Sequence, residues 1–187
     1  HCFPQAKLVY DLKCASVLAA EAVAAGGTCV MQPSGYGFIK TAMIEQQADL
    51  GVEASGHFFF KALHGGDDGL FAALLTGHIL AASGIALADL IQPIGWPPIT
   101  PELRIPLPDV ADELLGRIAA TCGGQVTRLD GVRAEYAEGW GLARISITEP
   151  VITLRFEGRH RESLREIAAR FLVGTPELYR HVQEKLG

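Results

Sequence analysis

A cluster of prolines divides the sequence into two parts with different patterns. Six of the ten prolines lie between residues 93 and 108, in the run PIGWPPITPELRIPLP. Because proline has a fixed φ and no backbone N–H, such a run disfavours helices and central strands and is typical of an extended connection. We therefore expect two domains, residues 1–97 and 98–187. The chain has 187 residues, which is enough for each to have its own core.

The first part alternates between strand-like and helix-like segments. LVYDL (8–12) and TCVMQ (28–32) are short apolar runs typical of strands, whereas ASVLAAEAVAA (15–25) is rich in helix-forming residues and FIKTAMIEQQ (38–47) has helical periodicity. Two short extended pieces, LGVEAS and HFFFK, follow. This alternation predicts an α/β domain with a mixed, partly parallel sheet.

Two of the expected helices have apolar residues that we expect to be buried. The helix over residues 38–47 has four such residues on one face, namely Phe38, Ile39, Ala42 and Met43. The run 71–88 is nearly as long and apolar as a membrane span, but Thr76 and His78 interrupt it and acidic residues flank it. We interpret it as a core helix followed by a shorter helix, and we expect no membrane partner.

The second part contains several consecutive strand-like runs. A helix is expected at about residues 110–121, and helices return from about 161. Between them lie VTRL, VRAEY, WGLARISI and VITLRFEG, separated by Gly, Asp or Pro. Residues 103–105 add one strand-like piece within the proline cluster. Consecutive strands flanked by helices predict an antiparallel sheet covered on one face, which is an α+β domain.

The charge and the cysteines exclude several classes of function. A net charge of -5 and a pI of about 5.7 argue against nucleic-acid and anionic-membrane partners, which require a broad cationic surface. The four cysteines lack CxxC spacing, so we expect reduced, mostly buried thiols. His64, Asp67 and Asp68 precede a helix, where carboxylates favour its N-terminus, and we predict no metal site there. The first residues, HCFPQAK, lack the pattern of a secretory signal, so we expect a cytoplasmic protein.

Four stretches, in this order and spacing, resemble the α-D-phosphohexomutase family of phosphomannomutases and phosphoglucomutases. They are VYDLKCASVL, GVEASGHFFFK with its following GGDDG, PITPELRI, and DGVRAEYAEGWGLARISITEPVITLRFEG. The resemblance covers nearly the whole chain. It implies that residues 1–97 are the third domain of a four-domain enzyme, a mixed-sheet α/β/α domain. Residues 98–187 would be the fourth domain, a TATA-binding-protein-like antiparallel sheet with helices on one face.

The resemblance also implies an activity for the intact enzyme. Family members are isomerases, intramolecular phosphotransferases that interconvert hexose 1-phosphate and 6-phosphate through a phosphoserine and a glucose 1,6-bisphosphate-type intermediate. Their serine loop of the TASHNP type and their Mg²⁺ loop of the DGDGDR type do not occur in this sequence. We therefore expect a C-terminal fragment that binds the phosphosugar, has the N-terminal domains of the same enzyme as partner, and is inactive alone.

The run RISITEP, residues 144–150, is the candidate phosphate-binding loop. Arg144 offers a planar guanidinium, and Ser146 and Thr148 offer hydroxyls. The residues alone favour a hairpin with an exposed arginine, whereas the resemblance favours a phosphate site. The family pattern is RxSNTxP, so Ile147 replaces an asparagine here. Glu149 adds a carboxylate, and since it would repel a phosphate we expect it to point outward.

The run GVEASGH, residues 51–57, resembles the family loop that reads sugar hydroxyls. Glu53 would accept from two adjacent hydroxyls, with Ser55 beside it. His57 would be a further polar contact or a proton acceptor. From the residues alone, Glu53 is equally explained as a solvated loop charge and His57 as a packing residue.

Two further residues are implied as sugar-phosphate contacts. Lys13 follows the first expected strand, where the family has a lysine that approaches the ligand; the alternative is a solvated residue at a strand end. Tyr36 lies in the loop PSGYG, where related enzymes often have histidine. It would contact the sugar or only close the loop.

Two other functions remain open at this stage. One is a non-catalytic sugar-phosphate-binding module that is complete as it stands. The other is a degenerate structural protein, which the departures at Tyr36, Ile147 and Glu149 would support.

Overall fold

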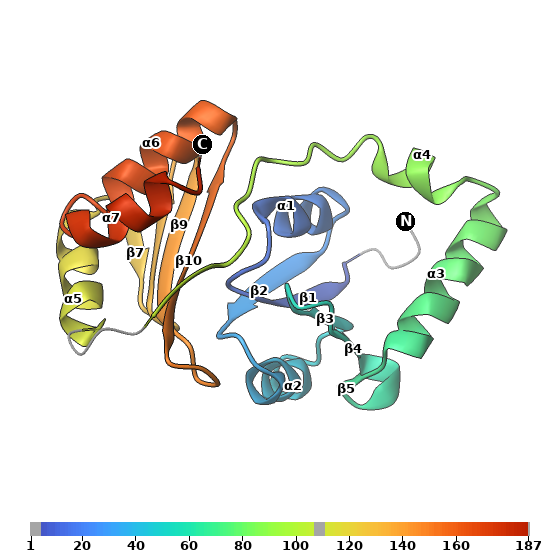
Figure 1. The fold of residues 1–187 in the computed structure, drawn as a ribbon. Helices are drawn as coiled ribbons and strands as arrows, with labels where there is room; N and C mark the ends of the chain where they lie inside the picture. The colour runs from blue at the N-terminus through green and yellow to red at the C-terminus, as the bar shows by residue number, and fades with distance from the viewer. Residues whose placement is uncertain (1–4, 107–110, 187) are drawn as a thin grey trace. The chain divides into compact units, whose positions relative to one another are not determined.

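A computed structural model describes residues 5–106 and 111–186. The chain divides into two compact units, His1–Trp96 and Pro97–Gly187, which we call the N-terminal and C-terminal units (Figure 1).

The N-terminal unit contains a five-stranded mixed sheet. Its strands are β1 (Lys7–Asp11), β2 (Thr28–Gln32), β3 (Leu50–Val52), β4 (Phe58–Phe60) and β5 (Gly66–Asp67). Their order is β2-β1-β3-β4-β5, with β1 parallel to both β2 and β3, and with β4 antiparallel to β3 and β5. The predicted mixed, partly parallel sheet is confirmed. Its parallel part places the ends of β1, β2 and β3 at one edge of the sheet.

Helices lie on both sides of this sheet. Figure 1 shows α1 (Ser16–Ala24) and α2 (Tyr36–Glu45) on opposite sides of it. Successive residues of β1 point to opposite faces, so Leu8 joins the cluster beside α1 and Val9 joins the cluster beside α2. The result is the expected α/β/α arrangement. A short 3-10 helix, η1 (Lys61–Leu63), connects β4 to β5.

The buried stripe of α2 is narrower than the sequence indicated. Ile39, Ala42 and Met43 are buried, as expected, but Phe38 is 48% exposed. Phe38 is one residue before Ile39, so its side chain points about 100° away around the helix axis. The inclusion of Phe38 in the buried face was therefore wrong.

The long apolar run forms α3 (Gly69–Ser83) and α4 (Leu87–Ile91). Asp68 caps α3 by accepting a hydrogen bond from the Phe71 N–H at 2.8 Å. Neither helix has a buried residue, and Leu70 is 72% exposed, so the expectation of a core helix was wrong. The apolar residues of α3 point to all sides of the helix, so its sequence defines no single stripe for packing. None of the described helices is long and apolar enough to span a membrane.

The C-terminal unit contains a five-stranded antiparallel sheet, as predicted. Its strands are β6 (Leu103–Pro106), β7 (Gln125–Thr127), β8 (Val132–Tyr136), β9 (Gly139–Ile145) and β10 (Val151–Gly158). Their order is β6-β10-β9-β8-β7, and every neighbouring pair is antiparallel. The connection from β9 to β10 is the expected phosphate loop.

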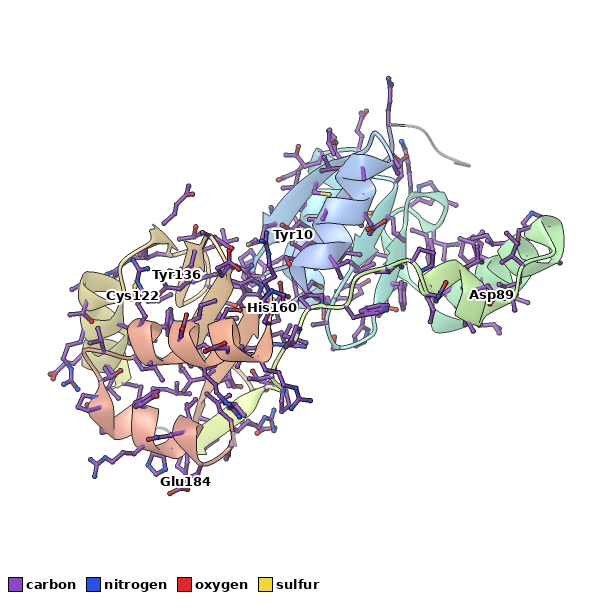
Figure 2. All side chains as sticks on the ribbon, turned by 90° about the horizontal axis from the view of Figure 1, so that it is seen from above. Tyr10, Asp89, Cys122, Tyr136, His160 and Glu184 are labelled. Carbon is purple, nitrogen blue, oxygen red and sulfur yellow. The ribbon has the colours of Figure 1, made fainter. Side chains whose placement is uncertain are left out.

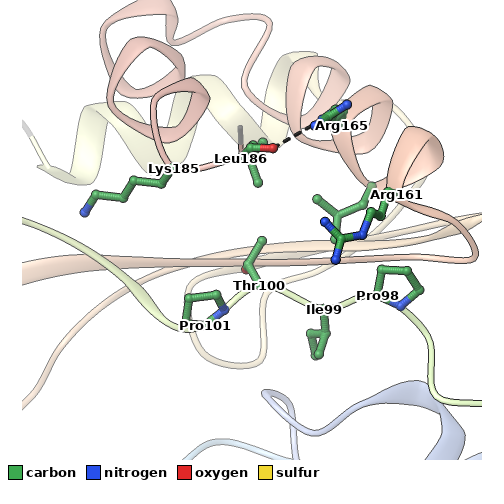
Figure 3. A pocket seen from close by; sticks show the side chains of 9 residues that line it. Pro98, Ile99, Thr100, Pro101, Arg161, Arg165, Lys185 and Leu186 are labelled. Atoms are coloured by element: carbon green, nitrogen blue, oxygen red, sulfur yellow. Dashed lines mark hydrogen bonds between the residues drawn. The ribbon is translucent and has the colours of Figure 1, made fainter.

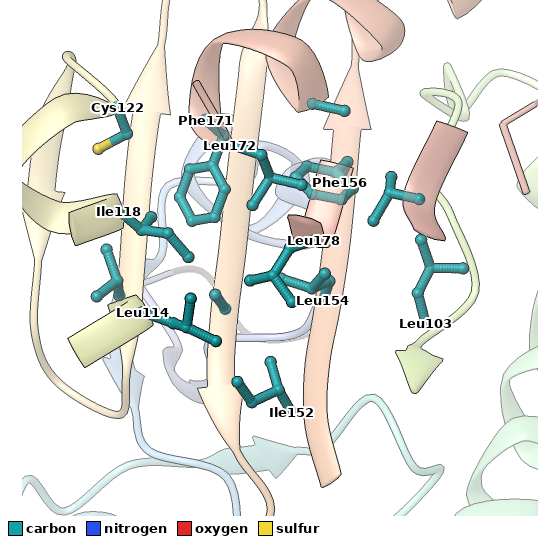
Figure 4. Close-up of a cluster of buried hydrophobic side chains, with 14 of the residues drawn as sticks. Leu103, Leu114, Ile118, Cys122, Ile152, Leu154, Phe156, Phe171, Leu172 and Leu178 are labelled. Atoms are coloured by element: carbon teal, nitrogen blue, oxygen red, sulfur yellow. The ribbon is translucent and has the colours of Figure 1, made fainter. Parts of the chain in front are cut away.

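Three helices cover one face of this sheet: α5 (Ala111–Thr121), α6 (Arg161–Phe171) and α7 (Pro176–Gln183). Figure 4 shows the apolar cluster between them and the strands, in which the rings of Phe156 and Phe171 have centroids 5.8 Å apart. A Cβ on Gly141 would lie 2.8 Å from the Phe171 ring, so this strand position requires the smallest residue. The core thus fixes β9 and β10, which carry the candidate phosphate-binding loop.

The cysteines are free thiols in the described part of the chain. Cys14 and Cys122 are buried and Cys29 is half-buried, as expected, while Cys2 lies outside the described residues. Figure 2 labels Cys122 beside Tyr136, whose hydroxyl donates to the Cys122 carbonyl at 3.1 Å. Burial raises the pKa of the Tyr136 hydroxyl well above its usual value.

Candidate functional site

A buried aspartate joins three loops at the edge of the N-terminal sheet. Asp11 is the last residue of β1 and has an exposure of 0%. Its carboxylate accepts from the Lys13 N–H at 3.1 Å, the Ser34 hydroxyl at 3.0 Å and the Ala54 N–H at 3.3 Å. The Cys14 thiol adds a contact at 3.2 Å. Because these donors follow β1, β2 and β3, one carboxylate holds together the loops that carry the predicted sugar contacts.

Lys13 and Tyr36 lie in or after two of these loops. The ammonium of Lys13 is 4.0 Å from Asp11, and its side chain is 15% exposed. Tyr36 is the first residue of α2 and is half exposed. Its hydroxyl accepts from the Lys40 ammonium at 3.2 Å, and its ring centroid is 5.4 Å from that of Phe59. The geometry leaves the Tyr36 ring accessible to a ligand.

The third loop presents Glu53, Ser55 and His57. It is a tight turn between β3 and β4, closed by a hydrogen bond from the Glu53 N–H to the His57 carbonyl at 3.0 Å. Gly56 has a φ of 89°, which a residue with a side chain rarely adopts. The Ser55 hydroxyl donates to one carboxylate oxygen of Glu53, Oε2, at 2.9 Å. The other oxygen, Oε1, is buried and has no hydrogen-bond partner among the described residues.

His57 forms a pair that the sequence did not predict. Its Nδ1 is hydrogen-bonded to the carboxylate of Asp67 on β5. This hydrogen bond, more than the attraction between the charges, raises the pKa of the His57 imidazole above its usual value. Asp67 was expected to favour a helix N-terminus, but Asp68 is the residue that caps α3. Asp67 instead orients the imidazole through its contact with Nδ1, and this contact does not involve the other ring nitrogen, Nε2.

The residues of the candidate phosphate-binding loop begin at the end of β9. Arg144 is 6% exposed, and its Nε donates to the carboxylate of Asp130 at 2.8 Å. The exposed arginine that the residues alone favoured is therefore wrong. Arg144 is the last but one residue of β9, and Ser146 directly follows the strand.

In the rest of this candidate phosphate-binding loop, the two hydroxyls lie close together. The Oγ of Ser146 is 3.4 Å from Oγ1 of Thr148 and accepts from the Glu149 N–H at 3.3 Å. The carboxylate of Glu149 accepts from Arg104 on β6 at 2.8 Å, and this exposed ion pair offsets part of its charge. Ile147, at the position of the family asparagine, is 75% exposed.

Two pockets in the described part of the structure lie away from these residues. In the C-terminal unit, a pocket of about 230 Å³ lies between residues 98–101 and helix α6, with Arg161, Arg165 and Lys185 at its rim (Figure 3). Another, of about 490 Å³, lies beside α2 and η1 in the N-terminal unit. No predicted site residue lines either one.

No group of three or more His, Cys, Asp or Glu side chains suited to a metal ion occurs within residues 5–106 and 111–186.

The sequence analysis missed the role of three carboxylates near these loops: Asp11, Asp67 and Asp130. Each is a carboxylate that holds another polar group by a hydrogen bond. The sequence did contain a signal for one of them, since Asp11 lies within the apolar strand-like run LVYDL. An acidic residue at the end of a buried strand requires hydrogen-bond donors around it.

Two family models match the chain. Residues 1–94 match phosphoglucomutase/phosphomannomutase, alpha/beta/alpha domain III, and residues 102–172 match phosphoglucomutase/phosphomannomutase, C-terminal domain.

Individual relatives match over most of this chain. A phosphoglucomutase of Neisseria meningitidis serogroup A is 37% identical over 178 residues, which are 90% of this chain and 38% of that protein. A phosphomannomutase/phosphoglucomutase of Pseudomonas aeruginosa is 38% identical over 173 residues, 90% of this chain and 37% of that protein. The chain thus spans less than two fifths of the length of these relatives.

Solved structures give the same result. The crystal structure of a phosphoglucomutase/phosphomannomutase family protein from Burkholderia thailandensis superposes with a TM-score of 0.82 at 34% identity, covering 93% of this chain and 38% of that one.

Proposed function

The chain belongs to the phosphoglucomutase/phosphomannomutase family, and from this membership we propose that it is the phosphosugar-recognition part of a hexose-phosphate mutase. In this proposal the N-terminal unit reads the sugar hydroxyls and the C-terminal unit holds the phosphate that is not being transferred. The loops that would carry these two tasks follow β3 and β9.

The observation that carries the proposal is the state of the Glu53 carboxylate. Its Oε2 is occupied by the Ser55 hydroxyl at 2.9 Å, while its Oε1 is buried and has no partner among the described residues. A buried acceptor without a donor costs free energy, about 1–3 kcal/mol for a typical polar group. A sugar hydroxyl would supply the missing donor, which supports a hydroxyl-reading role over that of a solvated loop charge.

The phosphate role is supported by the chemistry of the β9–β10 loop. Arg144 supplies a guanidinium whose two terminal amino groups match two phosphate oxygens, and Ser146 and Thr148 supply hydroxyl donors. Since Glu149 is paired with Arg104 at 2.8 Å, its carboxylate is drawn toward β6 and its repulsion of an anion is reduced.

Two residues of the N-terminal unit would act on the reacting end of the sugar. His57, with Nδ1 held by Asp67, has the geometry of a proton acceptor that works through Nε2. Lys13 would approach the ligand as a point charge. Tyr36 would stack on the sugar with its exposed ring.

The phosphate transfer itself requires groups that this sequence does not contain. We propose that in the intact enzyme a phosphoserine donates to the sugar, a glucose 1,6-bisphosphate-type intermediate reverses its orientation, and the other phosphate returns to the serine. Mg²⁺, held outside the residues described here, would supply charge neutralisation during that transfer. The enzyme would act in cytoplasmic carbohydrate metabolism, and this chain by itself would bind hexose phosphate without turnover.

The test is binding of glucose 1-phosphate and mannose 1-phosphate by calorimetry and NMR. We expect chemical-shift changes at Arg144 and Glu53 and weaker binding after Arg144→Ala and Glu53→Gln. The matched controls are Arg161→Ala and Glu21→Gln, since both residues are exposed and lie outside the two loops. Absence of heat and of shift changes with both sugars would overturn the proposal. Unchanged binding by Arg144→Ala would instead indicate a degenerate structural unit.

A further inference from the structure

The guanidinium of Arg144 is held by a carboxylate from a different strand connection. Asp130 lies between β7 and β8, and its Oδ2 accepts from the Arg144 Nε at 2.8 Å. The Arg144 side chain is 7% exposed and that of Asp130 is 15% exposed. A charged pair so well protected from water is much less screened than a surface pair.

The identity of the bonded nitrogen decides what this contact does. Nε is the guanidinium nitrogen nearest the backbone and carries one N–H. The other four N–H donors are on the two terminal amino groups. A carboxylate bonded at Nε therefore restricts rotation of the plane while it leaves terminal amino groups for an external anion. Asp130 can thus orient the fork that we assign to phosphate.

The backbone beside Asp130 is built against the same arginine. Gly131 has a φ of 80°, and a Cβ there would lie 2.3 Å from the Ala143 carbonyl oxygen and 2.7 Å from the Arg144 Cα. Both the dihedral angle and the close approach require glycine. The Asp130–Gly131 dipeptide therefore brings the carboxylate to Arg144 through a backbone contact that no other residue type permits without movement.

A second arginine in the same sheet shows a different arrangement. The Nε of Arg133 also donates to a carboxylate, that of Glu135 at 2.7 Å, but its guanidinium carbon lies 3.8 Å from the centroid of the Trp140 ring. Stacking on an aromatic face is a stabilising contact in its own right. The Arg133–Glu135 pair is therefore a matched control: it has the same Nε–carboxylate contact and lies outside the phosphate loop.

We propose that Asp130 is a positioning residue that fixes the Arg144 guanidinium for binding of a phosphate monoester. The inference rests on the proposed function, in which Arg144 binds the phosphate. It adds that the affinity depends on a carboxylate that does not touch the ligand, placed by a glycine turn between β7 and β8.

Two measurements on the full 187-residue chain test it. The first is the exchange rate of the Arg144 Nε–H in the absence of ligand, measured by NMR. We expect Asp130→Ala to accelerate this exchange at least tenfold, because the hydrogen bond that protects the proton is lost. Asp130→Asn retains an acceptor oxygen and should keep most of the protection. Glu135→Ala should leave the Arg144 exchange rate unchanged.

The second measurement is the dissociation constant for glucose 1-phosphate. Asp130→Ala should weaken binding about tenfold, and Asp130→Asn should recover affinity to within about threefold of the parent, because the amide oxygen still orients Nε. Glu135→Ala should bind as the parent does. A merely structural role for Asp130 would lower the melting temperature without this recovery by asparagine.

The outcomes separate the two proposals. Parent-like affinity and parent-like Nε–H exchange in Asp130→Ala would overturn the positioning role while leaving phosphate binding intact. If the parent chain does not bind glucose 1-phosphate, or if Arg144→Ala binds as tightly as the parent, the proposed function fails. The ligand-free exchange rate then still decides whether Asp130 orients the guanidinium.

Discussion

His57 and Asp67 are joined by a hydrogen bond between the imidazole Nδ1 and the carboxylate, which ties the turn before β4 to the short strand β5. The contact raises the pKa of the imidazole, with the hydrogen bond as the main cause. It gives the imidazole one fixed orientation in a loop that would otherwise hold it loosely.

This pair predicts a pH-dependent stability. Since the folded-state pKa of His57 is raised above the usual value of 6.5, the stabilisation is complete below about pH 6.5 and is lost as the pH rises through the folded-state value. The parent should therefore melt at a higher temperature than Asp67→Asn at pH 5.5, and the difference should shrink in alkaline solution. An NMR titration should show a lower His57 pKa in Asp67→Asn. The same His57 titration curve in both proteins would contradict this.

Substitution of Asp11 should destabilise the N-terminal unit. Asp11→Ala removes the buried carboxylate that accepts from the Ser34 hydroxyl and the Ala54 N–H. We expect a loss of about 2–4 kcal/mol in the free energy of unfolding, measured by urea denaturation. Glu21→Gln, an exposed change in α1, should shift it by less than about 0.5 kcal/mol. Equal effects of the two changes would show that the Asp11 contacts do not stabilise the fold.

Neutralising Glu149 should strengthen phosphate binding. The carboxylate is shared with Arg104 but remains in the loop with Ser146 and Thr148, so it still opposes an anion. Glu149→Gln should lower the dissociation constant for glucose 1-phosphate about two- to threefold at low salt, with a smaller change at high salt. Calorimetry at two salt concentrations checks both parts. A phosphate-bound crystal with Glu149 in contact with the anion would refute the outward orientation.

Truncation of Phe156 should weaken the C-terminal unit. Its ring is 0% exposed and packs edge-on against Phe171, so Phe156→Ala opens a cavity beneath α6. The expected cost is about 3–5 kcal/mol of unfolding free energy, readable from thermal and urea denaturation. Val126→Ala in the exposed edge strand β7 is the control and should cost far less.

The exposed faces of α3 should tolerate polar residues. Because Leu70 and Leu74 are 72% and 66% exposed, the double change Leu70→Gln and Leu74→Gln removes little buried area. We expect the free energy of unfolding to stay within about 0.5 kcal/mol of the parent. Binding of a hydrophobic dye should decrease, since the apolar surface that attracts it is smaller. A large loss of stability would show that these leucines are packed in solution.

Much of the fold was predictable because strand and helix periodicities are local. TCVMQ forms β2 and VRAEY forms β8, each over the whole expected run. The exposure of α3 was not predictable in this way, because an apolar sequence indicates that a helix favours burial but not which surface would cover it. Phe38 failed for a related reason, since the width of a buried stripe depends on the partner surface.

The candidate site was predictable only in part. The loop residues were found through a family resemblance, and their roles stay predictions. The carboxylates that hold them were missed, because Asp130 reaches Arg144 across 14 residues and Asp67 reaches His57 across 10. Such pairs depend on strand register, which a single sequence does not specify.

The contacts of the Asp11 carboxylate have a mechanical consequence for the edge of the N-terminal sheet. Loops that share one anchor cannot shift independently, so closure of any of them around a small molecule would drag the others along. Amide protons in all three segments should then gain protection in step, as one cooperative block, when a ligand touches a single segment.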